Sequence, residues 1–220
     1  MLRSRVHSLC LAATLTTVSA GASAGVIINN STNGLYNNGL GDLAATYGPN
    51  SLFFPGANVS EGDPNQNPLA EPDLSLTAEL GTDWLAGDYT GGTWSAGAVA
   101  IPSTWAVNTE TAIVYNFDLT ETSNLHLDLG VDNGIYVWLN GSYLFGAMAP
   151  GGSNLNEYDI DLAGLSAGNY NLQILREDHG GGTGFDILAT ATAAVPEPGT
   201  LALLGLGLAG LGFSRRRRPA

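Results

Sequence analysis

Strict alternation of apolar and polar residues determines which architectures are open to this chain. A β-strand places successive side chains on opposite faces, so a period of two predicts strands with one buried face. Turn-forming sequences separate the runs at Asp132-Asn133-Gly134, Asn140-Gly141 and Ala167-Gly168-Asn169. The apolar members of the runs are Leu74, Leu76, Ala78, Leu80; Ile113, Tyr115, Phe117, Leu119; Leu125, Leu127, Leu129; Ile135, Val137, Leu139; Tyr158, Ile160, Leu162; and Tyr170, Leu172, Ile174, with a last strand over 185–192. The pattern predicts an all-β, antiparallel β-sandwich.

The N-terminal 24 residues have the three parts of a signal peptide. Arg3 and Arg5 precede an apolar run from Leu9 to Val18, and Ala22-Ser23-Ala24 has the small-x-small pattern of a cleavage site. We expect cleavage after Ala24, which leaves an extracellular domain over 25–192. The alternative is an N-terminal membrane helix, for which the apolar run is short.

Cysteine and charge exclude several functions for that domain. Cys10 is the only cysteine and lies within the signal peptide, so the exported chain has no disulfide, thiolate nucleophile or cysteine-bound metal. Residues 25–195 contain one basic residue, Arg176, against 19 acids, a formal charge of −18. A field of that sign repels nucleic acids and anionic membranes and attracts cations such as Ca²⁺.

The C-terminal residues 193–220 have a layout suited to membrane sorting. Val195-Pro196-Glu197-Pro198 precede an apolar segment over 199–213, and Arg215-Arg216-Arg217-Arg218 follow it. As a helix, 200–213 spans about 21 Å at 1.5 Å per residue, less than a stable membrane span needs. The arginines orient the C-terminus toward the cytoplasm, and the prolines leave an extended peptide outside.

This tail resembles the PEP-CTERM sorting signal of Gram-negative bacteria, whose namesake motif matches Pro196-Glu197-Pro198. Such tails have also been labelled ice-binding protein C-terminal domains, which is no evidence for ice binding. The resemblance implies a transient inner-membrane stage, cleavage by an exosortase-type protease, and delivery to the cell surface or extracellular matrix. The alternative is a permanent C-terminal anchor formed by the short transmembrane helix.

A second resemblance covers residues 105–192. The segment from Val131 to Gly141 and the segment Leu165-Ser166-Ala167-Gly168-Asn169-Tyr170 are similar to signatures of PA14-like and galactose-binding-like jelly rolls. The resemblance implies a jelly-roll-like sandwich and contact with carbohydrate. Because many functions share this fold, the fold alone does not identify the ligand or the site.

No catalytic residue is predicted. His126 lies beside Asp128, about 7 Å apart along a strand, and we interpret it as a solvated outer-face histidine, since no Gly-x-Ser-x-Gly elbow is present. His179 falls in a Gly-rich turn over 179–184. Two carboxylate pairs have spacings that a glycan hydrolase could use, Asp128 with Asp132 and Glu157 with Asp159. A hydrolase is therefore an alternative function.

Calcium is the ligand that the turns suit best. It takes six to eight hard oxygen ligands, which acidic and amide side chains in loops supply. The candidate ligands are Asp132, Asn133, Asp178 and Asp186, with Glu157 further away along the chain. Solvated acidic turns without a metal are the alternative.

Aromatic residues give a second candidate site. Sugar rings stack on Trp and Tyr, and loops on β scaffolds commonly carry binding residues. The candidate glycan contacts are Trp84, Tyr89, Trp94 and Trp105. Tyr136 and Trp138 share a strand face, and we interpret Trp138 as a residue of the sandwich core.

Together these features predict a non-catalytic binding or structural protein of the cell surface that associates with exopolysaccharide. The alternatives are the hydrolase and a purely structural matrix or adhesion protein.

Overall fold

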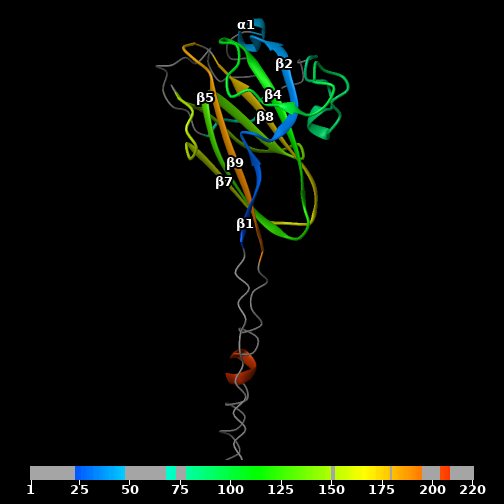
Figure 1. Ribbon diagram of the computed structural model, residues 1–220, viewed down its shortest axis with the longest axis vertical. Coiled ribbons are helices and arrows are strands. Elements are labelled where there is room, and N and C mark those ends of the chain that lie inside the picture. The colour runs from blue at the N-terminus through cyan, green and yellow to red at the C-terminus, as the bar shows by residue number, and fades with distance from the viewer. Residues whose placement is uncertain are drawn as a thin grey trace, which may run out of the picture.

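The longest strand, β5, joins the two layers of the domain. The computed structural model describes residues 23–47, 68–72, 78–149, 152–178, 180–194 and 204–208. Within these ranges the strands are β1 (Ala24–Asn29), β2 (Asn33–Gly41), β3 (Val99–Ala100), β4 (Glu110–Leu119), β5 (Ser123–Leu139), β6 (Ser142–Ala149), β7 (Tyr158–Leu165), β8 (Gly168–Glu177) and β9 (Gly184–Ala193). A short helix, α1 (Leu43–Tyr47), and a 3₁₀ turn, η1 (Trp84–Ala86), complete the elements of the domain (Figure 1).

All strand pairs are antiparallel, and β5 changes its partners half-way along. Residues Ser123–Asp132 pair with β9 on one edge, and Ser123–Leu129 pair with β7 on the other. Residues Gly134–Leu139 pair with β8 and β6 instead. One layer therefore contains β1, β9, the first half of β5 and β7, and the other contains β6, the second half of β5, β8, β4 and β2. The predicted all-β antiparallel sandwich is confirmed.

Alternating side chains fill the space between the layers. Leu125, Leu127 and Leu129 of β5 contribute from one layer, while Ile135, Val137 and Leu139 contribute from the other. The buried aromatic residues of this core include Tyr115, Phe117, Tyr158 and Phe185. The core is continuous, which is why one strand can leave the first layer and enter the second without exposing its apolar side chains.

A second apolar core lies on the opposite face of the β5–β8 layer. Tyr136 and Trp138 point away from the sandwich core, and both are fully buried. The covering side chains come from α1, η1 and the irregular segments, and include Leu43, Leu69, Leu80 and Trp84. The prediction that Trp138 is buried is correct, but the residue belongs to this outer core and not to the sandwich core.

Two sequence predictions need correction. Asp132-Asn133-Gly134 is a corner within β5, because the residues before and after it pair with different strands and not with each other. Of the alternating run over 74–80, only 78–80 are described, and they form a turn. By contrast, Asn140-Gly141 is the predicted hairpin turn between β5 and β6, with φ values of 48° and 74°.

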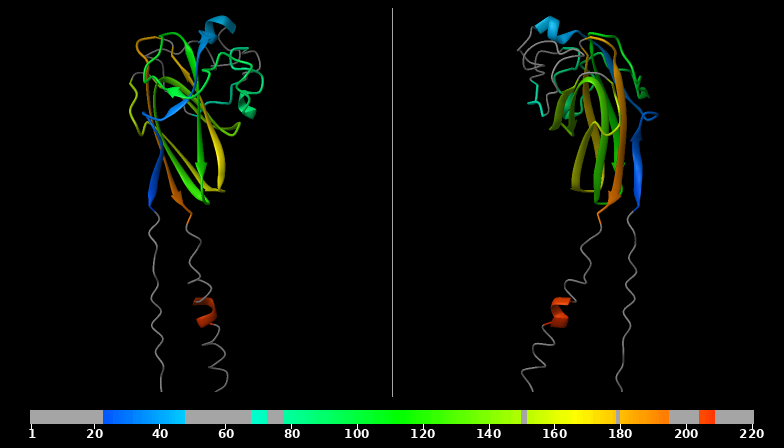
Figure 2. Two further views of the ribbon diagram at one scale, coloured as in Figure 1. Left: turned by 45° about the vertical axis from the view of Figure 1, so that its right-hand side comes forward. Right: turned by 90° about the vertical axis from the view of Figure 1, so that its left-hand side faces the viewer.

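Residues 1–22 of the predicted signal peptide, the sorting motif and the terminal arginines lie outside the described residues. Ala24, the last residue of the predicted signal peptide, is the first residue of β1. In the tail, residues 204–208 are described and are helical. Among the described residues, no helix combines the length and apolarity that a membrane crossing requires. The start of β1 and the end of β9 lie together at one end of the domain, and α1 lies at the other end (Figure 2).

Candidate functional site

Polar side chains are buried at the corner of β5. Asp132 pairs with Gly184 of β9, and two residues later Gly134 pairs with Glu177 of β8. The β8–β9 and β6–β7 connections must pass between the layers at this end, because their strands flank β5 on its two edges. Asp132 and Asn133 are 5% and 0% exposed and are joined by a cis peptide bond. The topology thus brings two loops to one buried acid–amide pair.

Three further acids are buried around the same corner, and we call Glu110, Asp132, Asn133, Glu177 and Asp178 the corner cluster. All five are buried. The backbone N–H of Leu43 donates to Glu110 Oε2 at 2.8 Å, and the N–H of Asn108 donates to Asp178 Oδ2 at 2.8 Å. These bonds join the start of α1 and the segment before β4 to the corner.

Glu177 occupies a position that only glycine on the neighbouring strand permits. A Cβ added at Gly134 would lie 2.5 Å from Glu177 Oε2, so any larger residue there would displace the carboxylate. Burial raises the pKa of Glu177 well above its usual value, and the nearby carboxylates of Glu110, Asp178, Asp42 and Asp132 add to the effect. The corner cluster is therefore a region of mutually repelling acids that favours protons or cations.

Replacing Glu177 with glutamine should change how stability depends on pH. A carboxyl with a raised pKa stabilises the folded state while it is protonated, and this contribution is lost as the pH rises from 4.5, the ordinary pKa of a glutamate carboxyl, through the folded pKa. In chelator, wild-type protein should therefore lose stability over that window relative to Glu177→Gln. Thermal unfolding between pH 4 and 8 tests this, with the exposed Asp118→Asn as the charge control. Parallel pH profiles for Glu177→Gln and wild type would contradict the assignment.

Three of the four predicted calcium ligands lie in the corner cluster, and the fourth lies outside it. Asp132, Asn133 and Asp178 belong to the corner cluster. Asp186 lies further along β9, opposite Gly130, where its carboxylate accepts hydrogen bonds from Asn30 Nδ2 at 2.6 Å and from Ser153 Oγ at 3.4 Å. Glu157 accepts from the backbone N–H of Val131 at 3.1 Å. Both acids thus lie near the corner, on the side of the β6–β7 loop.

The predicted aromatic contacts lie in two separate places. Trp84 is only 3% exposed and packs edge-on against Trp138, with ring centroids 5.5 Å apart, so it is not available to a glycan. Trp94 and Tyr89 are half-buried beside it, with their centroids 5.3 Å apart. Trp94 Nε1 donates to the carbonyl of Leu80 at 2.9 Å, which fixes its ring. Tyr89 and Trp94 are therefore the aromatic residues of this segment that retain accessible surface.

Trp105, the fourth predicted contact, packs against the domain's only arginine. The Arg176 guanidinium lies 4.3 Å from the Trp105 ring centroid, and Trp105 Nε1 donates to the carbonyl of Thr109 at 2.8 Å. Arg176 is fully buried. The sequence gives no indication of this contact, because 71 positions separate the two residues.

His126 is on the outer face of β5, as predicted, but both of its ring nitrogens have a hydrogen-bond partner within the protein. Its side chain is 42% exposed, and its two ring nitrogens face Asp128 and Asp161. Asp159, which the sequence paired with Glu157, lies opposite Asp128 in the β5–β7 register. The carboxylate neighbour of Asp128 across the sheet is therefore Asp159.

Glu110 and Glu177 are the site residues that sequence reasoning missed. Each lies at one end of a strand, β4 or β8, whose other residues alternate as expected. From the sequence, both would be interpreted as ordinary outward-facing acids. The detectable signal is the run Arg176-Glu177-Asp178, which places three charges in succession directly after the apolar residues of β8. Three successive charges cannot all point away from a two-layer fold.

Comparison with known proteins identifies the C-terminal tail. Residues 194–218 match the PEP-CTERM protein-sorting motif. The chain is therefore an exported protein that is targeted to the cell surface. No curated protein matches the chain.

Solved structures to which the chain is similar include two PA14 domains. The PA14 sugar-binding domain from an RTX adhesin is 15% identical with a TM-score of 0.36, covering 72% of this chain and 90% of that one. The PA14 domain of the MpAFP antifreeze protein is 15% identical with a TM-score of 0.31, covering 80% and 87%. The GH31 alpha-xylosidase from Xanthomonas citri is 7% identical with a TM-score of 0.31, covering 80% of this chain but 18% of the enzyme. At these TM-scores the likenesses assign neither ligand nor activity to this chain.

Proposed function

We propose that the exported domain binds carbohydrate at its loop end, with Ca²⁺ held at the corner of β5. The observation that carries this proposal is the corner cluster, in which four carboxylates and one amide are buried where two loops meet. Burial raises the pKa of Glu177, and repulsion by the neighbouring carboxylates raises it further. A bound divalent cation would relieve this repulsion and stabilise the loops around it.

The donor set fits calcium in its chemistry. Asp132, Asn133 and Asp178 offer carboxylate and amide oxygens, the hard ligands that Ca²⁺ prefers, and the adjoining loops add backbone carbonyls. When bound, Ca²⁺ would supply a positive centre to which neutral sugar hydroxyls can be drawn. On the β6–β7 side of the corner, Asp186 holds the side chain of Ser153 and Glu157 holds the backbone N–H of Val131.

Carbohydrate is the partner that the remaining surface fits best. The charge of residues 25–195 disfavours anionic polymers, whereas a neutral glycan meets no such repulsion. Tyr89 and Trp94 keep exposed aromatic surface, on which the apolar face of a sugar ring can stack. Exopolysaccharide of the producing cell is the partner we propose. The domain then acts as a binding or structural component of the matrix and not as a catalyst.

A glycan array probed with and without Ca²⁺ tests the proposal. We expect the full chain to bind neutral glycans in Ca²⁺, to lose binding in chelator, and to lose it in Asp132→Asn. Asp118→Asn is the matched control, because it removes one exposed carboxylate of β4. Silence under both conditions would rule out the carbohydrate proposal, and binding that resists chelator would rule out the calcium part.

Calcium binding also has a readout that needs no glycan. A ligand that binds only the folded state raises the unfolding temperature in proportion to the logarithm of its concentration once sites are filled. Millimolar Ca²⁺ should therefore raise the midpoint of wild-type protein and leave that of Asp132→Asn nearly unchanged. Equal shifts in both proteins would place the ion elsewhere.

The sorting tail has its own test in cells. We propose that an exosortase-type protease cleaves near Pro196-Glu197-Pro198 after transit through the inner membrane of a Gram-negative host. Deleting the tripeptide should leave the chain in the membrane fraction at a larger mass, whereas the wild-type product is released or transferred to the surface. An unchanged mass and location after deletion would show that the motif does not direct processing.

A further inference from the structure

We infer that His126, Asp128 and Asp159 form a second metal site, suited to a divalent transition metal such as Zn²⁺, on the outer face of the β7–β5–β9 layer. This site is separate from the corner cluster, and the inference does not depend on the proposed function. The strand pattern determines which side chains lie on this face. Leu125, Leu127 and Leu129 point into the core, so the residues between them point outward.

The strand register brings acids from β7 beside these outward residues. Asp161 lies opposite His126, and Asp159 lies opposite Asp128. Side chains directly opposite each other on one sheet face have Cβ atoms about 4.5–5.5 Å apart, close enough for a shared ligand. On the other side, β9 places the uncharged Thr190 opposite His126. The face therefore has one imidazole among three carboxylates.

The distances are those of a site that needs little adjustment. A ring nitrogen of His126 and one carboxylate oxygen each of Asp128 and Asp159 all lie within 4.8 Å of one another. Ligands about 2.0–2.1 Å from a tetrahedral metal are roughly 3.3 Å from each other. His126 Nε2 is already 3.0 Å from Asp128 Oδ1. Small rotations of two aspartate side chains would complete the arrangement.

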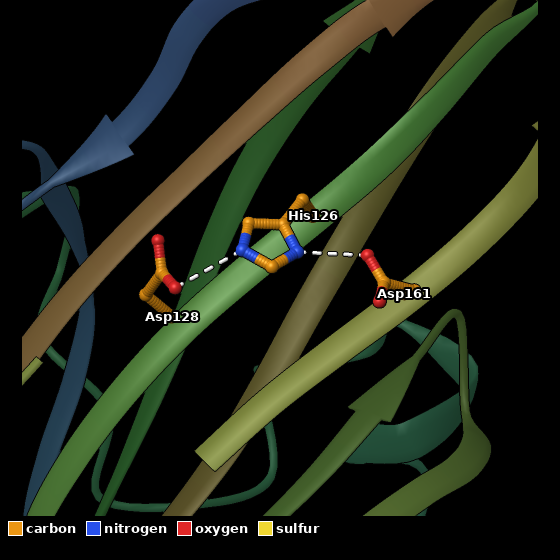
Figure 3. Close-up of polar contacts among 3 residues, drawn as sticks. All are labelled: His126, Asp128 and Asp161. Atoms are coloured by element: carbon orange, nitrogen blue, oxygen red, sulfur yellow. Dashed lines mark hydrogen bonds and ion pairs between the residues drawn. The ribbon is translucent and has the colours of Figure 1, made fainter. Parts of the chain in front are cut away.

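Asp161 supplies the orienting contact that metal-bound histidines usually have. Its Oδ1 lies 2.7 Å from His126 Nδ1, on the side of the ring away from Asp128 (Figure 3). If Nδ1 carries the proton and donates it to Asp161, Nε2 keeps its lone pair directed at the Asp128 side. A carboxylate behind a histidine in this way fixes the ring and raises its basicity.

The ligand types favour a transition metal over calcium. Imidazole nitrogen is a common ligand of zinc, copper and nickel, whereas calcium takes oxygen ligands. The site also has room for ligands from outside the chain. A surface pocket of about 390 Å³ lies beside it, lined by residues that include His126, Asp161 and Thr192. With three protein ligands, the metal would keep one coordination position for a ligand from outside the chain.

Protons compete with the metal for the same nitrogen. The hydrogen bond to Asp161 raises the pKa of His126, and the charge and hydrogen bond of Asp128 act in the same direction. The charged groups that face the ring are Asp128 on its own strand and Asp159 and Asp161 on β7, while β9 contributes Thr190. Metal affinity should therefore fall as the pH is lowered through the pKa of His126.

Zinc titration of the full chain tests the inference. Isothermal titration with ZnCl₂ at pH 7.5 should lose one site in His126→Gln, and Asp159→Asn should weaken that site at least tenfold. Asp161→Asn should weaken it about tenfold, the effect of losing an orienting contact. Co²⁺ bound in place of Zn²⁺ should give visible absorption that disappears in His126→Gln.

Matched variants keep the result interpretable. His179→Gln removes a histidine that is not one of the three proposed ligands, and Asp118→Asn removes an exposed acid, so both should titrate as wild type. His7 and Cys10 are present in every variant and contribute a constant background. Each variant is checked for an unchanged unfolding midpoint in chelator. Equal zinc stoichiometry in wild type and His126→Gln would overturn the inference and leave the cluster as ion pairs alone.

Discussion

Replacing Trp138 with alanine should lower the free energy of unfolding by about 3–5 kcal/mol, the range for large aromatic residues removed from a core. Trp138 is fully buried, with Trp84 and Tyr143 at centroid distances of 5.5 and 5.6 Å. Its Nε1 also donates to Glu71 Oε1 at 2.7 Å, so the residue ties an irregular segment to the β5–β8 layer. The substitution should therefore destabilise both the β5–β8 layer and the segments that pack on its outer face.

Urea unfolding followed by tryptophan fluorescence and circular dichroism measures this effect. Trp138→Phe is the matched control, because it keeps an aromatic ring and removes the hydrogen bond to Glu71. We expect this control to lose about 1–2 kcal/mol from the bond and the smaller ring. A loss below 1 kcal/mol for Trp138→Ala would mean that the outer core contributes little to folding.

Replacing Arg176 with alanine should have the second-largest effect, a loss of about 3 kcal/mol or more. The guanidinium lies 4.3 Å from the Trp105 ring centroid and 4.9 Å from that of Phe185. It donates from Nη1 to the carbonyl of Pro102 at 2.8 Å and from Nε to Thr111 Oγ1 at 3.0 Å. Burial lowers the pKa of Arg176 to about 10, so the group is charged at neutral pH. Removing it leaves a cavity and strips these acceptors of their donor.

Two substitutions separate the contributions of charge and volume. Arg176→Met fills most of the space without the charge, and replacing a buried ion with an apolar residue is often tolerated. Arg176→Lys keeps the charge but loses the planar stacking on Trp105. We expect stability to fall in the order wild type, Met, Lys and Ala, as measured by urea unfolding. Alanine as stable as wild type would contradict the role assigned to the buried guanidinium.

Local alternation was enough to predict these strands, because every second side chain of each strand faces the sandwich core. Ile113 to Leu119, Tyr158 to Leu162 and Tyr170 to Ile174 all became strands with the expected residues inside. The corner of β5 was not predictable in the same way. Asp132-Asn133-Gly134 has the composition of a hairpin turn, and only the distant strands β8 and β9 decide that it is a corner.

The candidate sites show the same division between local and long-range information. Asp132, Asn133 and Asp178 were found because acids and amides in turns are a local signal. Their association with Glu110 depends on strand order, which the sequence does not display. Trp84 was misjudged as a loop contact because nothing local indicates that its irregular segment covers Trp138. His126 and Asp161 are 35 positions apart and meet only through the β5–β7 register.

The direction of β9 determines how the domain carries tension. Strand β9 begins with Gly184 at the corner of β5 and ends with Ala193 beside the start of β1. These two residues are roughly 30 Å apart at about 3.3 Å per residue. If the domain captures a polymer at its loops, as we propose, a pull between that polymer and the cell envelope at the C-terminus runs along this strand. Its hydrogen bonds to β1 and β5 stand across the direction of pull. These hydrogen bonds are therefore loaded together in shear. A force perpendicular to the strand would instead break them one after another.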